Sequence, residues 1–185
     1  MRENNNKEEE IKFLADKMLG KLAKWLRILG YDTTYPITDE DLALILTARQ
    51  ENRILLTRDT NLIKRRNICD FLFIKGNLWE EQLSEVIKGL KIKIDFKSKI
   101  FSRCSLCNTP TIKIDKIKVE GYVPPYVFLT QNEFVYCPSC KKYYWKGTHW
   151  ERMTQKVQNL LGKTSMPGSF FPPKNSKEAP PPVEI

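Results

Sequence analysis

The chain has 185 residues, of which 41% are hydrophobic and 29% are charged, as in a globular protein of one or two domains. Its formal net charge of +9 favours a polyanionic partner, nucleic acid ahead of an anionic membrane, with a lysine-rich solvated surface as the simpler alternative. No apolar run approaches the roughly 20 residues that span a bilayer, and the polar, acidic start MRENNNKEEE is unlike a secretory signal. We therefore expect a soluble, cytoplasmic protein.

The first structured stretch is expected at residues 11–32. A short apolar run over residues 11–15 suits a buried strand, and it ends at Asp16. Apolar residues then recur at three- and four-residue spacing over residues 18–29, starting with Met18, and predict an amphipathic helix. Gly30 stands where a helix commonly ends. The polar face of this helix is expected to carry Lys17, Lys21, Lys24 and Arg27.

The next part of the chain alternates between short apolar runs and helical patterns. Residues 31–35, 54–57 and 69–74 read as strands, and residues 42–51, 61–66 and 78–90 read as helices. Asp41 or Asp39 is placed to cap the helix at residues 42–51. Residues 91–98 fit either an edge strand or a connector. The alternation predicts an α/β fold whose mostly parallel sheet lies between two layers of helices.

Two acids follow expected strands, and a third begins an expected helix. Asp16 ends the first strand, Asp59 comes shortly after ILLT, and Asp41 opens a helix reached from a strand. Because the carboxyl ends of parallel strands share one edge of a sheet, the three carboxylates are expected on one rim. They would form a cluster suited to a divalent cation. The simpler alternative for Asp41 and Asp59 is that each caps its own helix.

Four cysteines form two CxxC knuckles, Cys104/Cys107 and Cys137/Cys140. In an intracellular protein this pattern favours one structural zinc ion held by four thiolates, with a redox pair or a set of disulfides as the alternatives. Cys69 begins an apolar run and is expected to be a buried thiol. The lone His149 is expected to pack or to face a substrate, because the zinc shell is already complete.

The segment around the knuckles differs in character from the part before it. Residues 111–121 are strand-like, residues 123–128 read as a turn leading into another strand, and a helix is expected over residues 149–161. We expect a disordered leader at residues 1–10, an α/β domain at residues 11–98, a small β-rich zinc ribbon with its helix at residues 99–161, and a disordered proline-rich tail at residues 162–185.

Four blocks together resemble one known family: FLADKMLGKLAKWLRILGYDT, DEDLALILTARQENRILLTRD, the CxxC pair and YYWKGTHWERM. The resemblance, from about residue 11 to residue 161, is to the Mut-seven C-terminal RNase domain, a PIN-like nuclease fold fused to a zinc ribbon. It implies a PIN-like α/β/α domain whose acids bind Mg²⁺ or Mn²⁺. Carried over by motif, these acids are Asp16 in FLAD, Asp59 in LLTRD and Asp41 at the helix start. Asp39 and Glu40 are the alternatives for the middle acid.

The expected function is a divalent-metal-dependent ribonuclease that hydrolyses RNA phosphodiester bonds, with Asp16, Asp41 and Asp59 as both catalytic and metal-binding residues. The alternative is a non-catalytic RNA-binding or ribonucleoprotein-associated protein that retains the fold, and the proline-rich tail is a candidate site for a protein partner. The ribbon is expected to help bind single-stranded or structured RNA, with one exposed stacking residue among Tyr143, Tyr144 and Trp145. Candidate RNA contacts are Lys17, Lys21, Arg58, Lys141, Lys142, Trp145 and His149.

Overall fold

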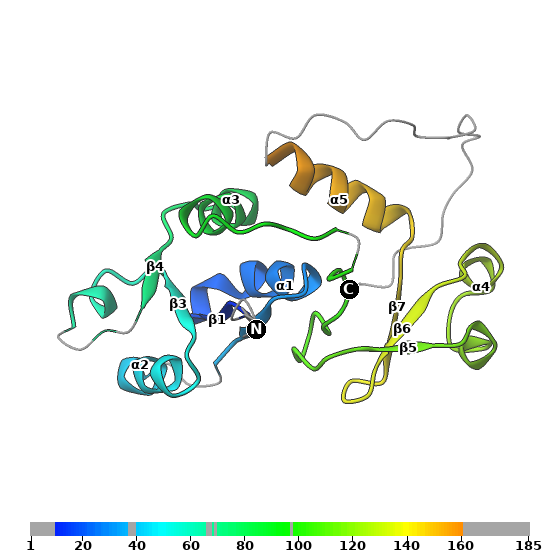
Figure 1. Cartoon of the computed structure of the whole chain (residues 1–185), viewed down its shortest axis with the longest axis horizontal. Helices are drawn as coiled ribbons and strands as arrows, with labels where there is room; N and C mark the ends of the chain where they lie inside the picture. The colour runs from blue at the N-terminus through cyan, green and yellow to red at the C-terminus, as the bar shows by residue number, and fades with distance from the viewer. Residues whose placement is uncertain (1–9, 37–39, 66–67, 69, 97, 161–185) are drawn as a thin grey trace, which may run out of the picture.

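The computed structural model describes residues 10–36, 40–65, 68, 70–96 and 98–160. It contains a four-stranded sheet and a three-stranded sheet, which lie at opposite ends of the view in Figure 1. The expected proline-rich tail, nearly all of the expected leader, Asp39 and Cys69 lie outside the described residues. No helix in the described ranges is both long enough and apolar enough to cross a membrane.

The four-stranded sheet is parallel throughout, as the alternating pattern predicts. Its order is β2 (Asp32–Thr34), β1 (Lys12–Ala15), β3 (Ile54–Thr57) and β4 (Phe71–Phe73). Ala15 pairs with Leu56, so β1 and β3 end side by side. The chain runs from β1 outward to β2 and later to β3 on the other side of β1. The crevice between the carboxyl ends of β1 and β3 is therefore a topological switch point, where open α/β sheets bind their ligands.

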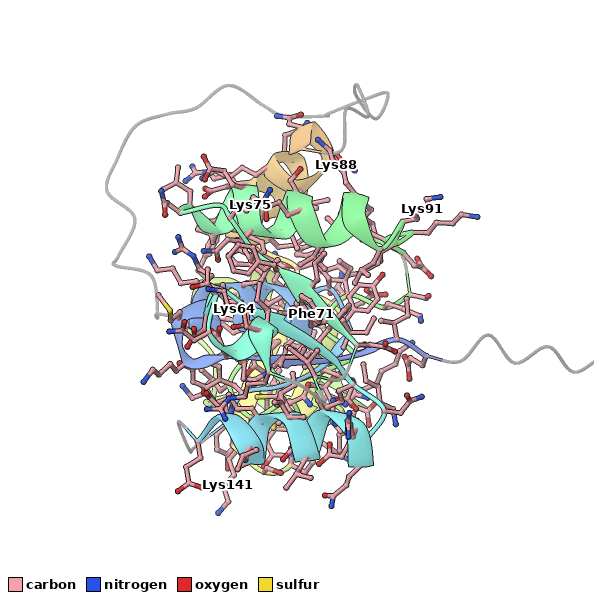
Figure 2. The ribbon with its side chains drawn as sticks, turned by 90° about the vertical axis from the view of Figure 1, so that its left-hand side faces the viewer. Lys64, Phe71, Lys75, Lys88, Lys91 and Lys141 are labelled. Carbon is pink, nitrogen blue, oxygen red and sulfur yellow. The ribbon has the colours of Figure 1, made fainter. Side chains whose placement is uncertain are left out.

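Helices cover both faces of this sheet. α1 (Gly20–Ile28) and α3 (Trp79–Gly89) share one face, where Phe13 and Leu56 lie in one buried cluster with side chains of both helices. α2 (Asp41–Gln50) covers the other face, where Leu14 and Leu55 are buried. Figure 2 shows the arrangement from the β4 edge, where Phe71 lies between α3 above and α2 below. The near-continuous apolar runs of β1 and β3 follow from this two-sided burial.

Two local predictions about the first helix are wrong. The chain after β1 forms a 3₁₀ helix, η1 (Lys17–Leu19), before α1 begins, and this changes the angular spacing of the side chains. Met18, expected on the apolar face, is therefore 58% exposed. Arg27, expected on the solvated face, is buried. Gly30 follows the helix with a φ of +91°, the left-handed conformation expected of a glycine in this position.

The second sheet is antiparallel, in the order β5 (Ile112–Ile114), β6 (Phe134–Cys137) and β7 (Lys142–Trp145). Most of the expected turn at residues 123–128 is instead helical, in α4 (Pro125–Thr130), and the next strand, β6, begins only at Phe134. Pro125 begins α4 in the position where proline favours a helix. A 3₁₀ helix, η3 (Lys116–Val119), precedes α4, and α5 (Thr148–Leu160) follows β7. Residues 91–96 and 98 form no strand, so this stretch is a connector.

A buried polar junction joins the two sheets. The Arg27 guanidinium on α1 donates to the carbonyl oxygen of Thr33 at 2.7 Å and to the carbonyl oxygens of Ser105 and Leu106 at 3.3 and 2.6 Å. Burial lowers the pKa of Arg27, an effect that the nearby cysteines and Asp32 oppose. Arg27 therefore ties α1 and β2 to the first cysteine knuckle.

Asp32 forms a second connection at the same junction. Its carboxylate pairs with Arg53 at 2.7 Å and Arg103 at 3.3 Å, and it accepts a hydrogen bond from the Asn108 amide at 2.7 Å. Phe101 and Tyr144 extend the core under α1 and α3 toward the second sheet, and α5 adds Met153 and Val157 to it. The two sheets thus share one continuous core.

Candidate active site and metal centre

Asp16 lies where β1 ends, at the switch point of the parallel sheet. Only 5% of the residue is exposed. Its Oδ1 accepts a hydrogen bond from the Met18 amide at 2.8 Å, and its Oδ2 accepts from the Thr57 hydroxyl and from the Arg58 amide at 2.9 Å. These donors fix both carboxylate oxygens and also make Asp16 the N-cap of η1.

Thr57 is a site residue that the sequence analysis missed. Its fully buried hydroxyl donates to Asp16 and accepts a hydrogen bond from the backbone N–H of Asp59 at 3.0 Å. It therefore links the end of β1 to the turn that carries the second acid. The signal in the sequence was a single polar residue that closes an apolar run directly before Arg58 and Asp59.

The other two acids also have partners within the protein. The Oδ1 atom of Asp59 accepts from the amides of Asn61 and Leu62 at 2.7 and 3.3 Å, directly before η2 (Leu62–Lys64), although the N-cap of η2 is Asn61. Asp41 is the first residue of α2, and its Oδ2 receives two hydrogen bonds from Arg65, at 2.6 and 2.9 Å. The N-cap of α2 is Glu40, so the predicted capping by Asp41 is wrong.

Asp16, Asp41 and Asp59 nevertheless line one pocket, together with Lys17, Met18, Leu44 and Leu62. The pocket volume of about 80 Å³ leaves room for a cation with bound water, since one water needs about 10–15 Å³ by the same measure. Hard divalent cations prefer carboxylate oxygens and retain several water ligands. The pocket therefore offers the donor type that such a cation requires. Glu40, the alternative middle acid, does not line it.

The carboxylates of this pocket do not form a closed ligand set. In the described ranges, no group of three or more acids brings its ligand atoms within 4.8 Å of one another. Asp41 would have to leave Arg65, at least in part, to share an ion with the other two. Both side chains are partly exposed, at 26% for Asp41 and 48% for Arg65, so this movement has a modest cost.

The cysteines, by contrast, meet at one point. The sulfur atoms of Cys104, Cys107, Cys137 and Cys140 all lie within 4.8 Å of one another and could hold a metal ion. Each knuckle ends in a tight turn with a residue at positive φ, Asn108 at 68° and Lys141 at 56°, whose amide donates to the carbonyl of the first cysteine at 3.0 and 2.8 Å. Four thiolates in a closed shell suit a structural zinc ion.

The thiols of this cluster differ in acidity. Burial opposes ionisation of Cys107, but hydrogen bonds with the side chain and backbone of Thr109 lower its pKa to about 6. A hydrogen bond with Cys107, together with burial, raises the pKa of Cys140 to about 12. Zinc binds thiolates, so loading this site is expected to release protons.

The remaining candidate RNA contacts fall into three groups. Lys17, Lys21, Lys141 and Lys142 are exposed, with Lys17 at the pocket. Arg58 is half-buried, and its guanidinium donates to the side chain of Asn77 at 2.6 Å. Trp145 is half-buried against Phe134, at a ring-centroid distance of 6.5 Å. His149 belongs to α5, but its side chain lies outside what the structure describes.

The protein thus combines a parallel α/β sheet, whose switch point carries three aspartates, with a cluster of four cysteines that could hold a metal ion. A family model described as the Mut7-C RNAse domain matches residues 11–157, and the chain belongs to that family. The family's description indicates a nuclease-type function with RNA as the substrate. Comparisons with curated proteins and with solved structures gave no significant match.

Proposed function

We propose that the protein is a divalent-metal-dependent ribonuclease that hydrolyses RNA phosphodiester bonds. In this proposal residues 11–98 form a PIN-like catalytic domain, and residues 99–161 form a zinc ribbon that aids RNA binding. The observation that carries it is the shared pocket of Asp16, Asp41 and Asp59 at the switch point of the sheet. Neither capping nor packing requires three acids from three separate elements to meet there.

Asp16, Asp59 and Asp41 are the residues that would hold Mg²⁺ or Mn²⁺. Such an ion supplies a nucleophilic water and stabilises the charge that develops on the phosphoryl oxygens. Asp16 is the most firmly positioned of the three, because Thr57 and two backbone amides fix its carboxylate. Lys17 lines the pocket directly after Asp16, and Lys21 follows one helical turn further; in this proposal both bind the RNA backbone.

One observation favours the alternative, a non-catalytic RNA-binding protein. Asp41 is engaged with Arg65, so its carboxylate is already neutralised without an ion. A protein that only binds RNA gains from such a pair, because the pair reduces the negative charge of a surface that faces phosphates. The two functions therefore differ in whether the protein cleaves RNA and whether that cleavage depends on the acids of the pocket.

The test is an RNA cleavage assay with Mn²⁺ or Mg²⁺ on wild type, Asp16→Asn and Asp59→Asn. We expect each substitution to lower the cleavage rate by about 100-fold or more, because each removes a charged ligand of the catalytic ion. The matched control is Asp70→Asn, an exposed acid directly before β4 at the opposite edge of the same sheet, which should cut like wild type. An inactive wild type would favour the non-catalytic alternative. Acid variants as active as the control would mean that cleavage does not depend on this pocket, and the proposed site would be wrong.

A further inference from the structure

The two faces of the antiparallel sheet have different surroundings. Val135 and Tyr144 pair across β6 and β7 on the face toward the central core, where Tyr144 packs on Phe101 with ring centroids 5.8 Å apart. Side chains alternate along a strand, so the neighbours of these residues point to the second face. There Phe134 is buried in a small cluster with Val119 and Val123.

The second face continues toward the cysteines as a row of tyrosines. Tyr136 pairs with Tyr143 across β6 and β7, and their ring centroids are 5.0 Å apart. Tyr122, held in the turn after η3, stacks on Tyr143 at 5.5 Å with an interplanar angle of 26°. We call Tyr122, Tyr136 and Tyr143 the tyrosine row. Tyr122 is 71% exposed, and the other two are half-buried, so the row presents aromatic surface to solvent.

The charges around the row favour an anionic partner. Residues 104–146 contain six lysines and three acids. Lys141, which is exposed, lies in the turn between β6 and β7, two residues before Tyr143. A partner that docked through apolar side chains alone would gain nothing from these lysines. A polymer that combines flat rings with regularly spaced phosphates matches both features of the surface.

We propose that the tyrosine row binds single-stranded RNA, with unpaired bases stacking on Tyr122 and its neighbours and the backbone passing Lys141. Only unpaired bases expose their flat faces, and aromatic side chains on small sheets bind them by stacking. The choice of RNA rests on the proposed function, but binding can be measured without cleavage. The stacking residue of the ribbon is then Tyr122, which is 71% exposed and stacks on Tyr143, because Tyr144 is buried and Tyr143 and Trp145 are half-buried.

The experiment compares two tyrosines of equal exposure. Tyr122 is 71% exposed in the row, and Tyr126 is 72% exposed on α4. The full zinc-loaded chain is titrated, without added divalent metal, into a fluorescein-labelled, unstructured oligoribonucleotide, and anisotropy gives the affinity. Tyr122→Ala should bind about 5-fold or more weakly, since each stacked base contributes about 1–3 kcal/mol. Tyr122→Phe and Tyr126→Ala should bind within about 2-fold of wild type, because the first keeps the ring and the second leaves the row intact.

A second measurement reports stacking itself. An oligoribonucleotide that carries 2-aminopurine should lose fluorescence on wild type and on Tyr126→Ala, and should lose less on Tyr122→Ala. A duplex of the same sequence should bind Tyr122→Ala as well as it binds wild type, because its bases are covered. Zinc content and circular dichroism, expected to be unchanged, show that each variant is folded.

Three results would overturn the tyrosine row as an RNA site: Tyr122→Ala binding like wild type, Tyr126→Ala losing as much affinity as Tyr122→Ala, or an equal loss on the duplex. Each of these results would favour a protein, rather than RNA, as the partner of the exposed tyrosine rings. The ribonuclease proposal fails separately. If wild type cuts no RNA but Tyr122→Ala weakens binding, the ribonuclease proposal is wrong and the tyrosine row remains an RNA site. If wild type cuts RNA but Tyr122→Ala binds like wild type, the ribonuclease proposal remains and the tyrosine row is not an RNA site.

Discussion

The cysteine cluster and the aspartate pocket are two candidate metal sites built in different ways. The four sulfur atoms come from two local knuckles and lie within 4.8 Å of one another. The three carboxylates come from separate elements: Asp16 follows β1, Asp59 follows β3, and Asp41 begins α2. Each accepts hydrogen bonds from other groups of the protein. Local turns bring the four sulfur atoms together, whereas the three carboxylates are held apart by their own hydrogen bonds and an ion pair.

The largest effect is expected at the cysteine cluster. Cys137→Ser should abolish zinc binding and unfold the antiparallel sheet, because Cys137 is fully buried and structural zinc binding contributes on the order of 10 kcal/mol of folding free energy. Metal analysis and circular dichroism measure the two losses. Ser139→Ala, an exposed position in the same knuckle, is the control and should keep its zinc. A Cys137→Ser protein with bound zinc and a wild-type melting curve would contradict this account.

The polar junction around Arg27 is expected to stabilise the contact between the first cysteine knuckle and the parallel sheet. Arg27→Met leaves the carbonyl groups of Thr33, Ser105 and Leu106 without their charged donor, and we expect a loss of about 2–4 kcal/mol in the free energy of unfolding. Denaturant titration measures this loss. Lys21→Met removes an exposed cation from the same helix and should change stability by less than about 0.5 kcal/mol. Equal effects of the two substitutions would mean that Arg27 does not hold the sheets together.

The same junction should weaken in acid. Burial alone would raise the pKa of Asp32, but hydrogen bonds from Arg53 and Asn108 and the charges of Arg53 and Arg103 lower it below its usual value. A carboxyl group with a lowered pKa in the folded state stabilises the protein above its unfolded pKa of about 3.9, and this contribution is lost as the pH falls through the folded pKa.

Unfolding curves between pH 7 and pH 3 test this prediction. Asp32→Asn should be less stable than wild type at neutral pH by about 1 kcal/mol, after allowance for solvent screening, and the difference should shrink below about pH 4. A difference that stays constant over this range would show that the Asp32 charge does not stabilise the junction.

The smallest expected effect on stability lies at the aspartate pocket. Arg65→Ala should change the free energy of unfolding by less than about 1 kcal/mol, because the Arg65–Asp41 pair is partly exposed. The same change should tighten Mn²⁺ binding severalfold, since it frees Asp41 and removes a positive charge. Calorimetric titration with Mn²⁺ measures the affinity, and Lys64→Ala on η2 is a charge-matched control. Weaker Mn²⁺ binding by Arg65→Ala than by the control would mean that Asp41 is not a ligand.

The sequence predicted the features that depend on short-range periodicity. The runs that became β1 and β3 were apolar because both of their faces are buried, and Asp16 and Asp59 follow them on the edge that parallel strands share. The cysteine spacing predicted the cluster, because each knuckle is a local turn. In these cases neighbouring residues determine the structure.

The errors had two causes: contacts with residues far along the chain, and a local 3₁₀ turn. Spacing alone placed Arg27 among solvated cations, but its acceptors Ser105 and Leu106 come from the first knuckle, far along the chain. The partner of Asp41, Arg65, could not be inferred for the same reason. Met18 is exposed because it belongs to the 3₁₀ turn that precedes α1. The spacing of apolar residues does not distinguish a 3₁₀ turn from the start of an α-helix.

Mn²⁺ binding to the zinc-loaded protein, followed by electron paramagnetic resonance, tests most directly whether the aspartate pocket binds a divalent cation. We expect a single saturable Mn²⁺ site that Mg²⁺ displaces, present in wild type and in Asp70→Asn and lost in the Asp16→Asn, Asp59→Asn double variant. The absence of saturable Mn²⁺ binding in wild type, or its persistence in the double variant, would contradict the account.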